Sequence, residues 1–145
     1  MKRLILSLLL LCSAQASMAL APYVHATQLA PAELPAQLAE VETKLQAAGF
    51  TVIARHAPKG LAQSGSLIVT DAGMLEAIRS IGGSAVVGAG VRVGVQANGA
   101  VSYMNPQYWY RAYLRGKFGN AQAAVTALQA KLAQALGAGE LFGGD

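Results

Sequence analysis

The sequence predicts an α+β fold, in which one domain holds a mainly antiparallel sheet covered by helices. Segments with apolar residues three and four positions apart, typical of helices, are interspersed with short segments of alternating polarity, typical of strands. An Asn98-Gly99 pair between two of these strands predicts a hairpin. After a signal peptide, the expected order is helix, strand, strand, helix, strand, strand, helix, helix.

The first half of this domain is expected to hold two helices and two strands. The apolar positions of the first helix follow a helical spacing: Leu34, Leu38, Val41, Leu45 and Ala48. Gly49 stands where a helix C-cap favours positive φ. Residues 50–56 and 65–70 are predicted as strands. Asp71 is a good N-cap for the second helix, which we expect to end at a pair of glycines.

The Asn98-Gly99 pair favours a two-residue type I′ turn, because both positions of that turn need positive φ. The strand before it alternates between valines and polar or small residues. A two-residue loop fixes the pairing, so that Gly94 lies opposite Tyr103. We therefore expect Tyr103 to lie over Gly94, near Arg92.

Two helices are expected after the hairpin. Pro106 suits the first turn of a helix that runs to about Arg115. Asn120 is expected to cap a last helix, which Gly137 ends. The remaining residues, to Asp145, are predicted to form a mobile tail, with docking of Leu141 and Phe142 onto the domain as the alternative.

The stretch from residue 37 to 106 contains a helix that leads directly into a strand, and a hairpin at residues 91–103 (VRVGVQANGAVSY) followed by Asn105-Pro106. In these features the chain resembles the bacterial family known as domain of unknown function 302. It departs from the family within residues 67–81, where the usual Asn-Pro turn after a strand has no counterpart. The resemblance implies an α+β fold that often self-associates, and it implies no known activity.

The N-terminus predicts a cleavable signal peptide. A start with two basic residues precedes an uncharged apolar run at residues 4–11, which is shorter than the roughly 20 residues of a membrane-spanning helix. Cleavage is expected after Ala19 or Ala26, so that residues 1–26 form the signal and 27–145 the domain. These features predict a soluble protein that is exported to the periplasm or secreted, and the resemblance to a bacterial family implies a bacterial source.

Residues suited to catalysis or metal binding are sparse. Cys12, the one cysteine, lies in the signal peptide, so the mature chain would have no disulfide and no thiolate site. His56 lies beside Arg55 and Lys59, a cationic neighbourhood that disfavours a metal ion. The glycine-rich run at residues 82–90 leads into a strand, whereas a phosphate loop precedes a helix. We therefore predict no catalytic residue, metal or cofactor, and rank an enzyme of unknown class last.

The charge is unevenly distributed along the chain. Eleven Lys and Arg against seven Asp and Glu give a net charge of +4, and loss of the two basic residues of the signal leaves +2. No acidic residue lies between Glu76 and Glu140. Six basic residues lie there: Arg79, Arg92, Arg111, Arg115, Lys117 and Lys131. This half could attract an anionic group, whereas the dense basic stripe of a nucleic-acid-binding protein is missing.

Six of the nine aromatic residues fall within residues 103–118. On the helix predicted there, Trp109, Tyr110, Tyr113 and Leu114 share one arc, of which Trp109, Tyr113 and Leu114 are expected to pack on the sheet. The other arc and its neighbours form the predicted ligand-binding site: Tyr108, Arg111, Arg115, Arg92 and Tyr103. Arginine and tyrosine side chains can bind a carboxylate, sulfate or phosphate through charge-assisted hydrogen bonds and stacking.

Three hypotheses follow. The first is a non-catalytic binding or accessory module, whose Tyr/Arg surface takes an anionic or amphiphilic small molecule or an acidic protein partner. The second is a structural protein whose aromatic helix mediates homodimerisation, through Tyr108 or Tyr110. The third is an enzyme, for which the chain offers the weakest candidates.

Overall fold

The computed structural model describes residues 20–144, so the predicted signal sequence up to residue 19 lies outside the described residues. One sheet contains all the strands of residues 20–144: β1 (Tyr23–His25), β2 (Thr51–His56), β3 (Ser64–Thr70), β4 (Val91–Gln96), β5 (Val101–Met104) and β6 (Leu141–Phe142). The α-helices are α1 (Leu34–Ala47), α2 (Ala72–Ile81), α3 (Pro106–Leu114) and α4 (Gln122–Leu136). Two short 3-10 helices, η1 (Gly83–Gly88) and η2 (Arg115–Asn120), follow α2 and α3.

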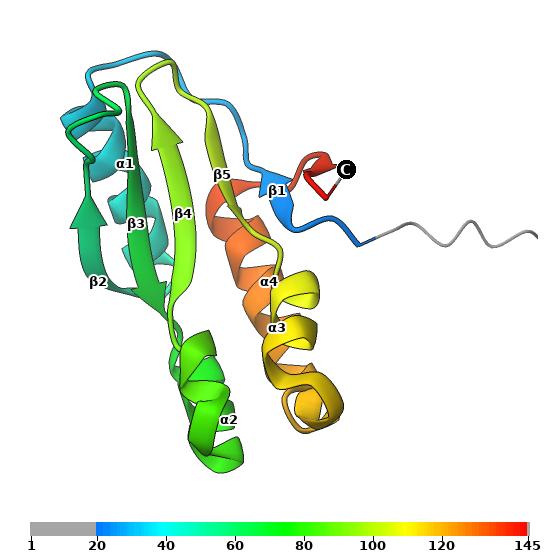
Figure 1. Cartoon of the computed structure of the whole chain (residues 1–145). Coiled ribbons are helices and arrows are strands. Elements are labelled where there is room, and N and C mark those ends of the chain that lie inside the picture. Colours follow the sequence, from blue (N-terminus) through cyan, green and yellow to red (C-terminus); the bar gives the residue numbers. More distant parts are fainter. Residues whose placement is uncertain (1–19, 145) are drawn as a thin grey trace, which may run out of the picture.

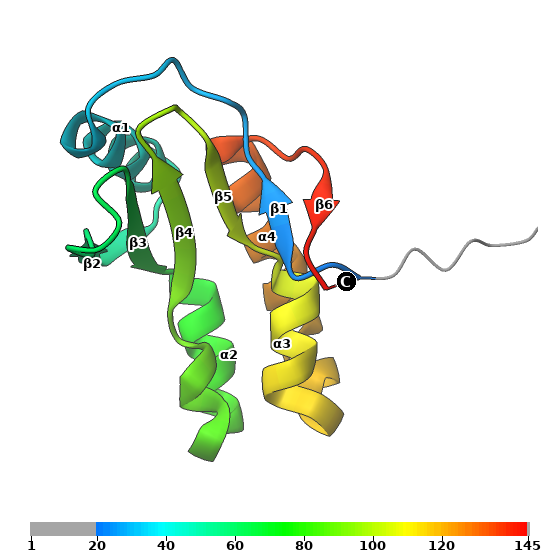
Figure 2. The same ribbon diagram turned by 45° about the horizontal axis from the view of Figure 1, so that its top comes forward.

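The six strands have the order β2-β3-β4-β5-β1-β6, and every neighbouring pair is antiparallel. Helices α1 and α4 cover one face of the sheet, the helix-covered face, while α2 and α3 project past one end of it (Figures 1 and 2). The predicted α+β fold with a single antiparallel sheet is confirmed. The predicted order of elements is also found, with one further strand at each end.

The core lies between the helix-covered face and the helices. On β4, Val91, Val93 and Val95 are buried on this face, as the alternation of the strand predicts. Both covering helices contribute an apolar stripe at helical spacing: Leu34, Leu38, Val41 and Leu45 from α1, and Val125, Leu128, Leu132 and Leu136 from α4. The opposite face, the open face, carries the other residues of each strand.

The hairpin has a different register from the predicted one. Tyr103 lies opposite Val93, not opposite Gly94, so the prediction is wrong by one residue. The loop holds three residues, 97–99, because the N–H of Gln96 donates to the carbonyl of Ala100 at 2.9 Å. Gly99 has a φ of 88°, the left-handed conformation that closes such a loop. Tyr103 therefore points to the helix-covered face, away from Arg92.

Both ends of the described chain form strands. β1 begins before residue 27, the predicted start of the domain, and pairs with β5. Leu141 and Phe142 pair with β1 as β6, so these two residues of the tail dock, which is the alternative that the sequence left open. Cleavage after Ala26 would remove β1, whereas cleavage after Ala19 would leave it intact. Within residues 20–144, no helix is both long enough and apolar enough to cross a membrane.

Candidate functional site

A groove of about 390 Å³ lies where α3 and η1 meet the open face. Its lining includes Ile68, Arg92 and Met104 from the sheet, Val87 from η1, and Trp109 and Tyr113 from α3. We call it the open-face groove. Apolar and aromatic side chains form most of this wall, and Arg92 is its cation. Binding sites for small molecules commonly combine an apolar lining with a few polar groups in this way.

The floor of the groove follows from the sequence around β4. Side chains alternate between the two faces of a strand, so Gly90, Arg92 and Gly94 share the open face. A Cβ atom on Gly90 would lie 3.0 Å from a methyl carbon of Ile68, and one on Gly94 would lie 3.3 Å from Ser102 Oγ. The absence of side chains on both glycines leaves the groove hollow on either side of Arg92.

Aromatic rings from α3 and β1 form one wall. The ring centroids of Trp109 and Tyr113 are 5.7 Å apart, and those of Trp109 and Tyr23 are 6.2 Å apart. The row continues to Phe142, 5.5 Å from Tyr23, and from there to His25, which stacks on Phe142 at 3.9 Å. The aromatic row thus joins three separate parts of the chain, and its members Tyr23, Trp109 and Tyr113 line the groove.

Helix α3 can form this wall because its N-terminus is well capped. The buried Asn105 accepts the N–H of Gln107 through its Oδ1 at 3.1 Å, and it donates from Nδ2 to the carbonyl of Ala21 at 2.8 Å. Pro106 then occupies the first turn, as predicted. The same cap therefore starts α3 and fixes the segment that leads into β1.

The predicted core arc of α3 is divided between two environments. Tyr110 and Leu114 are buried, whereas Trp109 and Tyr113 are half-buried: they pack against the core, as expected, and they also line the groove. Successive helix positions differ by about 100°, so Trp109 and Tyr113 lie along one edge of the arc and Tyr110 and Leu114 along the other. The edge with Tyr110 and Leu114 packs into the core, and the edge with Trp109 and Tyr113 faces the open face of the sheet.

Two tyrosine hydroxyls belong to the core. Tyr110 donates from its hydroxyl to the carbonyl of Gly88 at 2.6 Å, and burial, with smaller effects of Tyr113 and Asp71, raises its pKa well above the ordinary value. Tyr103 donates to the carbonyl of Gly137 at 3.0 Å, and burial raises its pKa too. Tyr103 contributes to the groove lining, but its hydroxyl is already used.

The structure does not bring the five predicted site residues together. Arg92 lines the open-face groove, and Tyr103 borders it although its side chain points to the helix-covered face. Tyr108 is half-buried with its ring 5.4 Å from that of Trp109, and the exposed Arg111 holds its guanidinium 4.2 Å from the ring centre of Phe118. Arg115 lies in a second hollow. Arg92 lies beside an aromatic wall formed by Trp109 and Tyr113, neither of which was among the predicted site residues.

This second hollow, which we call the basic hollow, lies between the end of α2 with η1 and the end of α3 with η2. It has a volume of about 530 Å³, and Arg115 and Lys117 are its cations. Val87 and Tyr113 line both hollows, which therefore adjoin at this pair. Arg115 has a φ of 49°, the one positive value found outside glycine in residues 20–144.

The ion pairs explain which cations remain available. Four basic residues pair with carboxylates: Lys44 with Glu40, Arg55 with Glu42, Arg79 with Glu76, and Lys131 with Asp71. Among residues 20–144, Arg92, Arg115 and Lys117 have no such partner, and no carboxylate lines either hollow. The acid-free stretch of the sequence thus forms a cationic surface in the fold.

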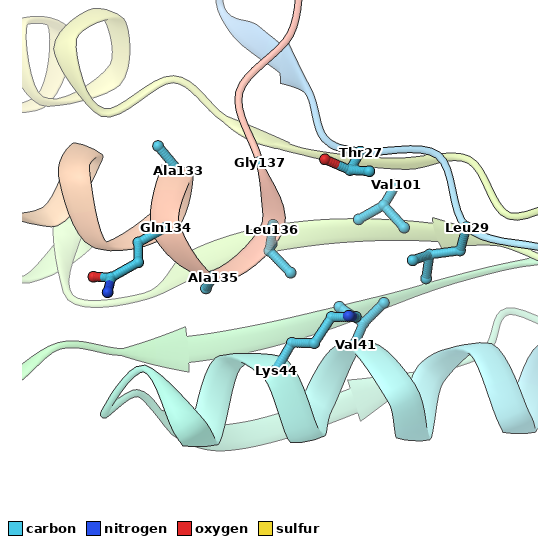
Figure 3. A pocket seen from close by; sticks show the side chains of 10 residues that line it. All are labelled: Thr27, Leu29, Val41, Lys44, Val101, Ala133, Gln134, Ala135, Leu136 and Gly137. Carbon is cyan, nitrogen blue, oxygen red and sulfur yellow. The ribbon is translucent and has the colours of Figure 1, made fainter.

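A third cavity of about 280 Å³ lies between α1 and α4 (Figure 3). Its lining is mainly apolar, with Val41 and Leu136 among its residues, and the side chain of Lys44 reaches toward it. The Nζ atom of Lys44 already lies 3.8 Å from Oε1 of Glu40. This cavity is therefore a less favourable site for an anion than the open-face groove.

Other chemistry finds little support in the described part of the chain. Asp71 is buried, caps α2 by accepting the N–H of Met74 at 2.9 Å, and pairs with Lys131, so its carboxylate is occupied. His56 is exposed at the end of β2. Within residues 20–144, no three His, Cys, Asp or Glu side chains gather as metal ligands would.

No model of a known protein family matches the chain, and no curated protein sequence matches it either. The resemblance to domain of unknown function 302 stays a prediction made from the sequence pattern.

Proposed function

We propose that this protein is a binding module that takes an amphiphilic anion in the open-face groove, with the anionic group on Arg92 and the apolar body between the aromatic wall and Ile68. The observation that carries the proposal is Arg92 itself. It lies between Gly90 and Gly94 in a mainly apolar groove, without a carboxylate partner in residues 20–144.

Physical chemistry favours this class of ligand. A guanidinium forms two parallel hydrogen bonds with a carboxylate, sulfate or phosphate. The rings of Trp109 and Tyr113 offer large apolar surfaces with little side-chain freedom to lose on binding. A ligand with only the charge would leave these rings exposed, and one with only the apolar body would leave Arg92 unpaired.

The proposal includes export. A mature chain that starts at residue 20 would keep β1, and with it Tyr23 in the wall of the groove. We therefore propose that signal cleavage follows Ala19 and that the protein binds its ligand in the periplasm or outside the cell. Mass spectrometry of the protein purified from an exporting bacterium would test this, since an N-terminus at residue 27 would contradict it.

Binding is tested by isothermal titration calorimetry with octanoate and octyl sulfate, using 1-octanol as the uncharged counterpart. We expect both anions to bind more tightly than the alcohol and to bind more weakly as salt is raised. Arg92→Gln should weaken anion binding by about tenfold or more, because a charge-assisted hydrogen bond is lost.

The matched control is Arg79→Gln, which removes an exposed arginine of α2 that pairs with Glu76. It should leave binding unchanged. If the anions bind no better than 1-octanol, or if both variants behave alike, the open-face groove is not an anion site.

The homodimer hypothesis loses one of its two residues. Tyr110 is fully buried inside the domain, so it is not available to a seam between two copies. Tyr108 is half-buried on α3, and a homodimer that forms through Tyr108 stays a prediction.

A further inference from the structure

The open-face groove and the basic hollow together form a longer surface. They meet at Val87 and Tyr113, which line both. Val87 is 60% exposed, and it belongs to η1, which packs against α3. The junction between the two hollows is therefore apolar, whereas Arg92 lies in one hollow and Arg115 and Lys117 lie in the other.

The cationic ends of this surface have no internal partner. The four ion pairs of residues 20–144 involve none of these three side chains, and neither hollow contains a carboxylate. Cations that gather without acids attract anions and repel one another. A ligand with an anionic group at each end would neutralise both ends.

Arg115 occupies a backbone position that glycine would fill more easily. Its φ of 49° lies in the region that L side chains rarely adopt, and Gly116 follows it. Packing does not explain the side chain, because Arg115 is exposed. An arginine at this position is therefore expected to contribute more to the surface than to the stability of the fold.

We propose that the ligand is an elongated dianion with an apolar middle. This proposal rests on the proposed function of the open-face groove. One anionic group binds Arg92, the apolar middle lies over Val87 and Tyr113, and the second anionic group binds Arg115 and Lys117. The two charge contacts act together, because binding at one end raises the effective concentration of the other.

The test is calorimetry with straight-chain dicarboxylates from hexanedioate to hexadecanedioate, each compared with the monocarboxylate of the same length. We expect an optimum length at which the dicarboxylate binds at least about tenfold more tightly. The combined variant Arg115→Gly/Lys117→Gln should lose this advantage and keep the monocarboxylate affinity. Its melting temperature should not fall below that of the wild type, because glycine suits the position.

A second variant tests the path between the hollows. Val87→Trp places a large ring on an exposed position at the junction, so it should reduce the dicarboxylate advantage more than the affinity for a short monocarboxylate. The proposal is overturned if dicarboxylates show no advantage at any length, or if the advantage survives in Arg115→Gly/Lys117→Gln. Monocarboxylate binding that depends on Arg92 would still stand in those cases, whereas absence of that binding would overturn the proposed function itself.

Discussion

The indole N–H of Trp109 donates a hydrogen bond of 2.9 Å to the carbonyl oxygen of Pro22. The same oxygen accepts the backbone N–H of Asn105 at 2.7 Å. The wall of the open-face groove is therefore attached to the N-terminal segment, which leads directly to Tyr23 in the same wall. Residues that are distant in the sequence form one aromatic surface because this contact joins them.

Trp109→Phe tests the importance of this contact for stability. The change keeps an aromatic ring in the wall but removes the donor to Pro22, whose carbonyl keeps Asn105 as a partner. We expect the free energy of unfolding to fall by about 1 kcal/mol. Urea unfolding followed by circular dichroism measures it.

Tyr108→Phe is the control for that measurement. Tyr108 neighbours Trp109, but its hydroxyl forms no hydrogen bond within residues 20–144, so stability should change by less than about 0.5 kcal/mol. Equal losses in the two variants would show that the indole N–H does not stabilise the N-terminal segment.

Tyr110→Phe should change both stability and its dependence on pH. Near neutral pH the loss of the hydroxyl leaves the carbonyl of Gly88 without this donor, which should cost about 1 to 2 kcal/mol. Burial raises the pKa of Tyr110 above its ordinary value of 10.0. The folded protein therefore holds this proton more tightly than the unfolded chain does.

The sign of the pH effect follows from this difference. A raised tyrosine pKa gives a stabilising contribution that is fully present below pH 10.0, the ordinary value, and is lost as pH rises above it. Wild-type stability should therefore fall more steeply than that of Tyr110→Phe above about pH 10. Urea titrations at a series of alkaline pH values measure both slopes, and parallel curves would contradict the prediction.

Gly99→Ala tests the observed hairpin. A Cβ atom on Gly99 would lie 2.1 Å from the carbonyl oxygen of Leu29, and the φ of 88° already disfavours a side chain. We expect a loss of about 2 kcal/mol or more. Gly60→Ala is the control, because nothing lies within 4 Å of its Cβ position, and its stability should stay within about 0.5 kcal/mol of the wild type.

The contact between Gly99 and Leu29 also explains why the sequence predicted the hairpin but not its register. Asn-Gly is compatible with a two-residue loop and with a three-residue loop that ends in a left-handed glycine. The N–H of Leu29 donates to the carbonyl of Gly99 at 2.9 Å, a contact between distant parts of the chain. Local preference located the turn, whereas tertiary packing selected its length.

The candidate site, like the hairpin, was predictable only in part from the sequence. The alternation of β4 placed Arg92 on the open face, and Pro106 located the start of α3. Helical periodicity alone does not show that one edge of the apolar arc would face a groove, because that depends on how α3 sits against the sheet. Tyr23 was missed because it lies close to the signal peptide. Gly90 and Gly94 each lie two positions from Arg92 in the sequence. This pair of glycines was the one local signal of a hollow floor.

Gly94→Val tests whether ligand binding in the groove can be lost while the fold stays stable. Valine favours strands more than glycine does, and the new Cβ would lie 3.3 Å from Ser102 Oγ, a hydroxyl that can rotate away. Stability should therefore stay within about 1 kcal/mol of the wild type. The side chain would fill the floor beside Arg92, so we expect octanoate affinity to fall by about tenfold or more.

Gln96→Val is the matched control. Gln96 lies on the same face of β4, two residues further along, but it is exposed and does not line the groove. The same valine there should leave octanoate affinity unchanged in calorimetry. If Gly94→Val binds octanoate as the wild type does while remaining folded, the ligand does not occupy the space beside Arg92, and the anion must bind elsewhere on the cationic surface.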